Sequence, residues 1–171
     1  MRSSEISTGF DPARLIESHQ AGVWRYLRAL GCDPTEADDL TQETFLTVLQ
    51  KPFDDYNRSA TASYLRRVAH NLFISQKRRA GRVTAVANIE EVDALWARWI
   101  TNDNGDALLQ ALKTCLGKLT ERARWALEMR FRDRKTRSEI AAALEITEHG
   151  AKNLMQRAKK QLRTCVESKI E

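Results

Sequence analysis

The sequence predicts an all-α protein made of two small helical domains joined by a flexible linker. Only 7 Gly and 3 Pro occur in 171 residues, whereas helix-forming Ala, Leu, Arg, Glu and Lys are abundant. Apolar residues recur at helical spacing in several stretches that begin at capping residues. Charge alternates in blocks along the chain. We therefore expect a flexible tail over residues 1–10, a first domain over 11–80, an acidic linker over 81–105 and a second domain over 106–171.

The first domain begins with a helix that Asp11 caps, with Pro12 at its first position, and that ends at Gly31. His19 lies on the apolar face of this helix, and we interpret it as a core residue. A second helix opens at Pro34 and Thr35, with a capping box that we assign to Thr35 and Asp38, and it stops before Pro52.

The second helix presents an acidic face that carries Asp38, Asp39, Gln42 and Glu43. Paired acids suggest catalysis, but no partner His, Cys cluster or Gly-rich phosphate loop lies nearby in the sequence. We interpret this face as a solvated surface or as a docking surface for a basic partner.

A third helix, expected from Ser63 to about Arg79, follows a stretch of loop composition over residues 51–62. Two explanations for Phe53 and Tyr56 remain open, since they either anchor the loop to the core or help to hold an unstacked base. No acidic residue occurs over 61–82, which favours contact with nucleic acid over a salt-bridged surface helix. The candidate contacts are Tyr56, Asn57, Arg58, Arg66, Arg67, Asn71, Lys77, Arg78 and Arg79.

The linker is acidic and contains a candidate short helix over residues 90–99. Trp96 and Trp99 lie in this helix, and we expect them to pack on a domain or on a partner, because tryptophan is rarely left in solvent.

The second domain ends in two helices that meet across a very short turn. A helix from Asp106 to Gly117 and a helix from Thr120 come first, and the second of these is expected to carry Phe131 on its apolar face. Thr136 and Glu139 then form a capping box, and Thr147 caps a last helix that runs to about Ser168. This layout is typical of a helix-turn-helix, although an ordinary helical hairpin with a solvated basic face is the alternative. The candidate contacts to DNA are Thr136, His149, Lys152, Asn153, Gln156, Arg157 and Lys160.

The sequence offers no catalytic constellation, metal site or cofactor motif. Cys32, Cys115 and Cys165 are far apart and odd in number, so we expect reduced, structural residues and no disulfide. No apolar run approaches the roughly 18 residues that span a bilayer, and no signal core follows the start. We expect a cytoplasmic protein without membrane insertion.

Three blocks in order resemble regions two and four of bacterial RNA polymerase sigma factors of the extracytoplasmic-function (ECF) group. They are ADDLTQETFLTVLQ (37–50), YLRRVAHNLFISQKRR (64–79), and LTERARWALEMRF (119–131) followed by SEIAAALEIT and RAKKQLR. The resemblance covers nearly the whole chain.

The resemblance implies a transcription initiation factor without enzymatic activity of its own. The acidic helix would dock on the coiled coil of the polymerase beta-prime subunit through Asp38, Asp39, Leu40, Gln42, Glu43 and Phe45. The third helix and its preceding loop would read and melt the minus-ten promoter element. The helix-turn-helix would bind the minus-thirty-five element and touch the polymerase beta flap. An anti-sigma protein is an implied further partner.

The chain departs from the family pattern at several positions. Tyr64 replaces the usual Trp and Ser75 the usual Asp, and the start of the last helix reads TEHGAKNL over 147–154. Promoter preference therefore does not transfer from relatives. Two other functions remain open: a dimeric helix-turn-helix regulator that binds a palindrome without polymerase, and a polymerase-binding adaptor that lacks promoter recognition.

Overall fold

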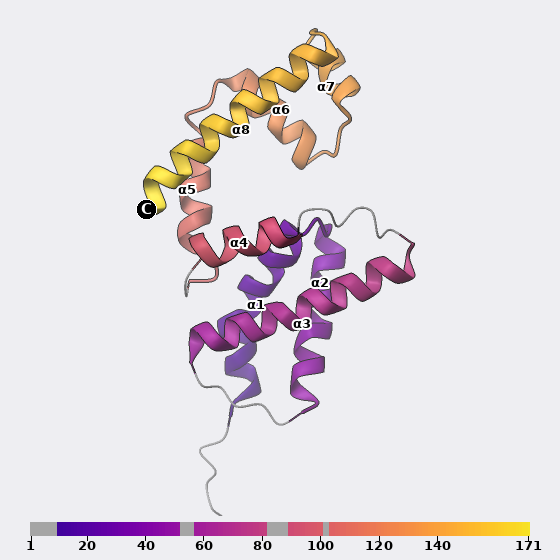
Figure 1. The fold of residues 1–171 in the computed structure, drawn as a ribbon, viewed down its shortest axis with the longest axis vertical. Helices are drawn as coiled ribbons and strands as arrows, with labels where there is room; N and C mark the ends of the chain where they lie inside the picture. Colours follow the sequence, from indigo (N-terminus) through magenta and orange to yellow (C-terminus); the bar gives the residue numbers. More distant parts are fainter. Residues whose placement is uncertain (1–9, 52–56, 82–88, 101–102) are drawn as a thin grey trace, which may run out of the picture. The chain divides into compact units, whose positions relative to one another are not determined.

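The computed structural model describes residues 10–51, 57–81, 89–100 and 103–171, and all regular elements in these ranges are helices. The chain divides into two compact units between Gly105 and Asp106 (Figure 1). The all-α, two-domain fold class is confirmed. None of the helices in the described ranges is long and apolar enough to cross a membrane.

The N-terminal unit is built on three helices: α1 (Pro12–Ala29), α2 (Pro34–Leu49) and α3 (Arg58–Arg79). The three pack against one another, and α3 crosses the other two (Figure 1). Their buried core is apolar and comes from all three helices. It contains Leu15, Val23, Leu27, Leu40, Phe45, Val48, Leu65, Ala69 and Phe73. His19 is buried as predicted.

Two helix starts differ from the predictions. The cap of α2 is Asp33, not Thr35. The Asp33 carboxylate accepts from the Glu36 N–H at 2.8 Å, and the Glu36 carboxylate accepts from the Asp33 N–H at 3.0 Å. Helix α3 begins five residues before Ser63, because the side chain of Asn57 accepts from the Ala60 N–H at 2.8 Å and caps the helix there.

Helix α4 (Ile89–Trp99) falls in the segment predicted as linker, and it belongs to the N-terminal unit. Trp96 is buried and meets the ring of Tyr26 edge-on, at 5.4 Å between centroids. Farther along, Asn104 donates to the Ser18 carbonyl at 2.8 Å, and Arg25 donates to the Asn104 carbonyl at 2.9 Å. The end of this segment is thereby tied to α1.

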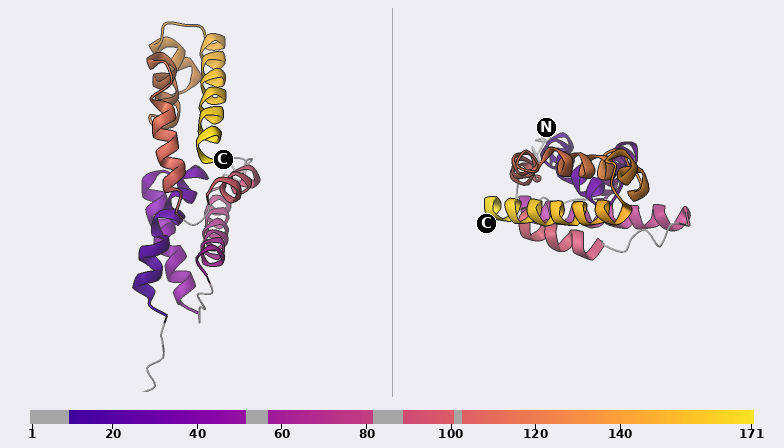
Figure 2. Two further views of the ribbon diagram at one scale, coloured as in Figure 1. Left: turned by 90° about the vertical axis from the view of Figure 1, so that its left-hand side faces the viewer. Right: turned by 90° about the horizontal axis from the view of Figure 1, so that it is seen from above.

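The C-terminal unit contains α5 (Asp106–Leu116), α6 (Glu121–Phe131), α7 (Arg137–Ala143) and α8 (Glu148–Ile170). Helices α6 and α7 pack on the first half of α8 around Ala126, Ile140, Ala151 and Met155. Helix α5 lies beside the second half of α8, as both views of this unit show (Figures 1 and 2). One long helix therefore contributes to two apolar clusters, and its Leu162 packs against both.

Phe131 is not on the apolar face of α6, and this prediction is wrong. Its side chain is 62% exposed, and the ammonium of Lys159 on α8 lies 5.6 Å from its ring centroid. Met129 is buried instead, in one cluster with Ala123, Ala126 and Leu127 of α6 and with apolar residues of α7 and α8.

The expected reduced state of all three cysteines is also contradicted. Cys115 and Cys165 form a disulfide between α5 and α8, while Cys32 is free and buried. The two residues are 50 positions apart in the sequence, so only the packing of α5 on α8 brings their Cα atoms to 5.9 Å.

Candidate functional site

The acidic face of α2 reaches solvent as one surface. Asp39, Gln42 and Glu43 are all exposed, and their three- and four-residue spacing places them on one side of the helix. Asp38 is exposed too, but its carboxylate accepts a hydrogen bond from the Trp24 indole at 2.7 Å. Asp38 thus helps to hold α2 against α1.

Leu40 and Phe45, which the family pattern placed among the polymerase contacts, are buried in the core instead. They cannot touch a partner while the unit keeps this packing, and their part is to fix the orientation of α2. Sequence reasoning missed Leu46, which is 63% exposed. It lies seven residues after Asp39, so it extends the surface of Asp39, Gln42 and Glu43 by one turn. We call these four residues the α2 surface. The sequence did contain an indication that Leu46 is exposed, because this leucine lies outside the apolar stripe of its helix.

The basic residues of α3 separate into two groups. Arg67, Asn71 and Arg78 are exposed and share one face by helical spacing, and Arg79 is exposed beside them. These four residues form the α3 surface. The spacing places side chains that can bond phosphates and base edges in one row, without an acidic residue among them.

Arg66 and Lys77 belong to the other group, which faces neighbouring helices. The Lys77 ammonium lies 3.4 Å from the Glu36 carboxylate of α2, and its side chain is only 13% exposed. Arg66 lines a polar hollow of about 230 Å³ with Tyr26, His70 and Asp93, and the exposed Arg67 also lines it. Burial lowers the pKa of the Arg66 guanidinium, and the nearby Tyr26 and Asp93 oppose that effect. Both cations therefore contribute to the packing of the unit.

The predicted loop residues take different places. Asn57 is the cap of α3, and Arg58, its first residue, donates to the Ser18 carbonyl of α1 at 3.4 Å. Both sit at the helix start rather than in a loop. Tyr56 and Phe53 lie outside the described residues.

Helix α8 places its predicted contacts together. These side chains, which we call the α8 row, are all exposed. They follow helical spacing on the side opposite the buried Ala151, Met155 and Ala158. The row contains His149, Lys152, Asn153, Gln156, Arg157 and Lys160. Thr136 stands apart, since its hydroxyl caps α7 by accepting from the Glu139 N–H at 3.2 Å.

The turn before the α8 row is fixed by polar contacts from three helices. Thr147 caps α8 by accepting from the Gly150 N–H at 3.0 Å. Arg122 of α6 donates to the Leu144 carbonyl at the end of α7, at 2.6 Å, and Arg137 lies 3.8 Å from Glu148. Between the helices, Glu145 adopts a left-handed backbone conformation with φ of 54°. These contacts fix the short turn between α7 and α8, which is the layout of a helix-turn-helix.

No group of three or more His, Cys, Asp or Glu side chains able to hold a metal ion occurs in the part of the chain that the structure describes.

Comparison with known families matches one family model to each of the two units. The family model described as Sigma-70 region 2 matches residues 15–83, and that described as Sigma-70, region 4 matches residues 109–162. The ECF RNA polymerase sigma factor SigL of Mycobacterium tuberculosis is 29% identical over 157 residues, which cover 90% of this chain and 87% of SigL.

A second relative is the ECF RNA polymerase sigma factor SigE of Mycolicibacterium smegmatis, 29% identical over 152 residues. The match covers 87% of this chain and only 59% of SigE. Among solved structures, a chain of the RsbN-BldN complex is 20% identical, with 90% of each chain covered and a TM-score of 0.32. With both sigma regions present in order in a two-unit helical fold, the chain belongs to the sigma-70 family, in its ECF group of RNA polymerase sigma factors.

Proposed function

We propose that this sigma factor initiates transcription by binding core RNA polymerase and directing it to promoters that carry specific minus-ten and minus-thirty-five elements. The α2 surface would dock on the beta-prime coiled coil, because an exposed leucine among acidic side chains suits a helical partner that offers apolar and basic groups. The match to both sigma regions supports the assignment of this surface to polymerase.

The observation that carries the promoter part of the proposal is the exposure of the whole α8 row on the side opposite the core. A helix with Lys, Asn and Gln along one free face can enter the major groove and bond base edges there. The α3 surface would contact the minus-ten element, with Asn71 toward a base and its Arg residues toward phosphates. Because the two units are small, we expect weak binding to DNA until polymerase aligns both of them.

The beta flap and an anti-sigma protein are proposed as further partners on the family relationship alone. The function requires a place where polymerase and promoter DNA meet, so we propose that the protein acts in the bacterial cytoplasm.

The test is reconstitution with bacterial core polymerase. The purified protein is mixed with core enzyme, the complex is isolated by size exclusion, and transcription is measured on a library of promoter fragments. We expect co-elution and initiation at a restricted set of sequences. The double variant Asp39→Lys/Glu43→Lys serves as the matched control, since both residues are exposed and their reversal leaves the core intact.

The charge reversal should abolish co-elution while the circular dichroism spectrum stays unchanged. Normal binding by the double variant would contradict the docking assignment. Co-elution without initiation would favour the adaptor, and tight binding of a palindrome by the protein alone would favour a dimeric regulator.

A further inference from the structure

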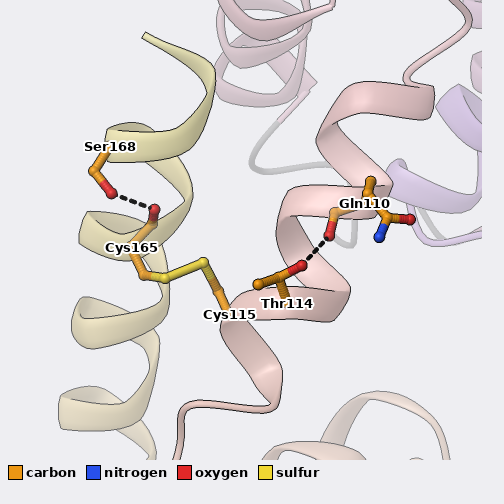
Figure 3. Close-up of a disulfide and its surroundings, with 5 residues drawn as sticks. All are labelled: Gln110, Thr114, Cys115, Cys165 and Ser168. Atoms are coloured by element: carbon orange, nitrogen blue, oxygen red, sulfur yellow. Dashed lines mark hydrogen bonds between the residues drawn. A yellow bond between two sulfur atoms is a disulfide. The ribbon is translucent and has the colours of Figure 1, made fainter.

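The disulfide between Cys115 and Cys165 links two helices that otherwise pack on each other through apolar side chains. Figure 3 shows the two side chains meeting between α5 and the last turns of α8. The hydroxyls nearby are engaged within their own helices, since Thr114 donates to the Gln110 carbonyl and Ser168 to the Cys165 carbonyl. Neither hydroxyl bonds the opposite helix in these contacts.

Apart from the disulfide, α5 is held by a small apolar cluster. Ala111, Cys115 and Val166 are its buried members, and the other apolar side chains around them are only partly buried. Helix α5 packs mainly on α8, whereas α6 and α7 share a larger cluster around the first half of α8. Loss of the covalent bond would therefore weaken α5 more than it weakens the helix-turn-helix.

We propose that Cys115 and Cys165 form a reversible thiol–disulfide switch that locks α5 onto α8 when oxidised and loosens it when reduced. The proposal rests on the proposed function in one respect: a protein that works on polymerase and DNA meets the thiol reductants of the cytoplasm, where permanent structural disulfides are rare. A bond between these two cysteines would then form and break with the redox state of the cell.

The chemistry needs only a low-molecular-mass disulfide, such as oxidised glutathione, as oxidant. Cys165 is the more accessible of the two, so its thiolate attacks one sulfur of that disulfide and releases one glutathione thiolate. The Cys115 thiolate then attacks Sγ of Cys165 and releases the second. The two cysteines lose two protons and two electrons, and one oxidised glutathione becomes two reduced molecules. Excess reduced thiol drives the same steps in reverse.

Cys32 is not expected to compete in this exchange. It lies in the core of the other unit, and burial raises the pKa of its thiol to about 11, so very little thiolate is present near neutral pH. The substitution Cys32→Ala therefore serves as the matched control, because it removes a cysteine without touching the pair.

The expected consequence of reduction is local. The α8 row ends at Lys160, before Cys165, and it is supported by the larger cluster around Ile140 and Met155, to which α5 contributes the partly buried Leu116. Helix α5 and the last turns of α8 should open more often in the reduced protein, whereas α7 and the first turns of α8 should keep their protection.

The first experiment places the full-length protein in glutathione buffers that range from a cytosolic to an oxidising poise. Thiol state is read by alkylation and mass spectrometry, and local opening by hydrogen exchange. We expect the Cys115–Cys165 bond to open and close across this range. Reduction should accelerate amide exchange in α5 and the end of α8 and should lower the melting temperature on the order of 10 °C.

The same response is expected from Cys32→Ala and is expected to be absent from Cys165→Ser. A bond that persists at the cytosolic poise would overturn the switch in favour of a permanent crosslink. Thiols that fail to pair at the oxidising poise, or equal exchange in both states, would overturn it as well. None of these measurements uses polymerase. A negative result therefore overturns the switch without bearing on the proposed sigma function. Conversely, a failed reconstitution with polymerase does not change the result of the thiol titration.

Discussion

The phenol of Tyr26 in α1 donates a hydrogen bond to the carboxylate of Asp93 in α4, at 2.5 Å. Burial, followed by this hydrogen bond, raises the pKa of Tyr26, so the phenol stays a donor throughout the ordinary pH range. The ring of the same tyrosine also meets Trp96. One residue of α1 thus contacts α4 with both its polar and its apolar parts.

The substitution Tyr26→Phe should lower the free energy of unfolding of the N-terminal unit by about 1 kcal/mol, because it removes the hydrogen bond and keeps the ring. Urea denaturation measures the change. The control is Asp93→Ala alone and combined with Tyr26→Phe, since a pair that interacts gives non-additive losses. Strict additivity would show that the bond contributes nothing to stability.

Leu46→Ala should weaken binding to core polymerase roughly tenfold, since loss of a leucine buried in an interface costs on the order of 1–2 kcal/mol. Stability should hardly change, because Leu46 is exposed in the free protein. Fluorescence anisotropy of labelled protein titrated with core enzyme gives the affinity. Tyr64→Ala, which removes an exposed aromatic side chain from α3, is the control. Equal affinities of Leu46→Ala and the wild type would remove Leu46 from the docking surface.

Asn153→Ala should reduce initiation at the preferred upstream element by roughly tenfold or more, since a good base contact is worth about 1–3 kcal/mol of discrimination. Lys152→Ala should act in the same direction. Arg157→Ala is the informative comparison, because loss of a phosphate contact weakens all upstream sequences alike and lowers the salt dependence. Transcription by the reconstituted holoenzyme on promoters with varied upstream elements measures both effects. An Asn153 variant that keeps its full sequence preference would exclude that residue from base reading.

Glu145→Gly should stabilise the C-terminal unit by about 1 kcal/mol, because glycine adopts the left-handed conformation of this turn without the steric cost of a Cβ. Glu145→Ala removes the same carboxylate but keeps the Cβ, so it should give no such gain. Thermal unfolding of the two variants beside the wild type separates backbone strain from charge. If both substitutions raise the melting temperature equally, charge rather than conformation is responsible.

Stability should fall as the pH rises from about 9 toward about 11. Burial raises the pKa of Cys32 from 9.0 to about 11, so the unfolded state loses the thiol proton first and is favoured over that range. The contribution of this group is fully present below pH 9 and is reduced by about 1 kcal/mol at pH 10. Urea denaturation at successive pH values measures the slope. Cys32→Ala should make it shallower, and an unchanged slope would assign the pH dependence to other groups.

The sequence alone predicted the all-α class, the helix starts at Asp11, Thr120, Thr136 and Thr147, and the exposed row of α8. These features depend on neighbours within a few residues along the chain. Capping needs one side chain three positions from an amide, and an amphipathic row needs only the 3.6-residue period. The starts of α2 and α3 also depend on nearby residues, but they were predicted wrongly. Asp33 and Asn57 cap these helices in place of Thr35 and Ser63.

The tertiary structure decided what depends on distant residues. It placed Leu40 and Phe45 in the core and left Leu46 exposed, turned Lys77 toward Glu36 and Arg66 toward Asp93, and brought Cys115 to Cys165. Each outcome depends on which helix packs beside another and at what rotation. A local pattern does not contain that information, because periodicity marks the faces of a helix but not the element that will cover each one.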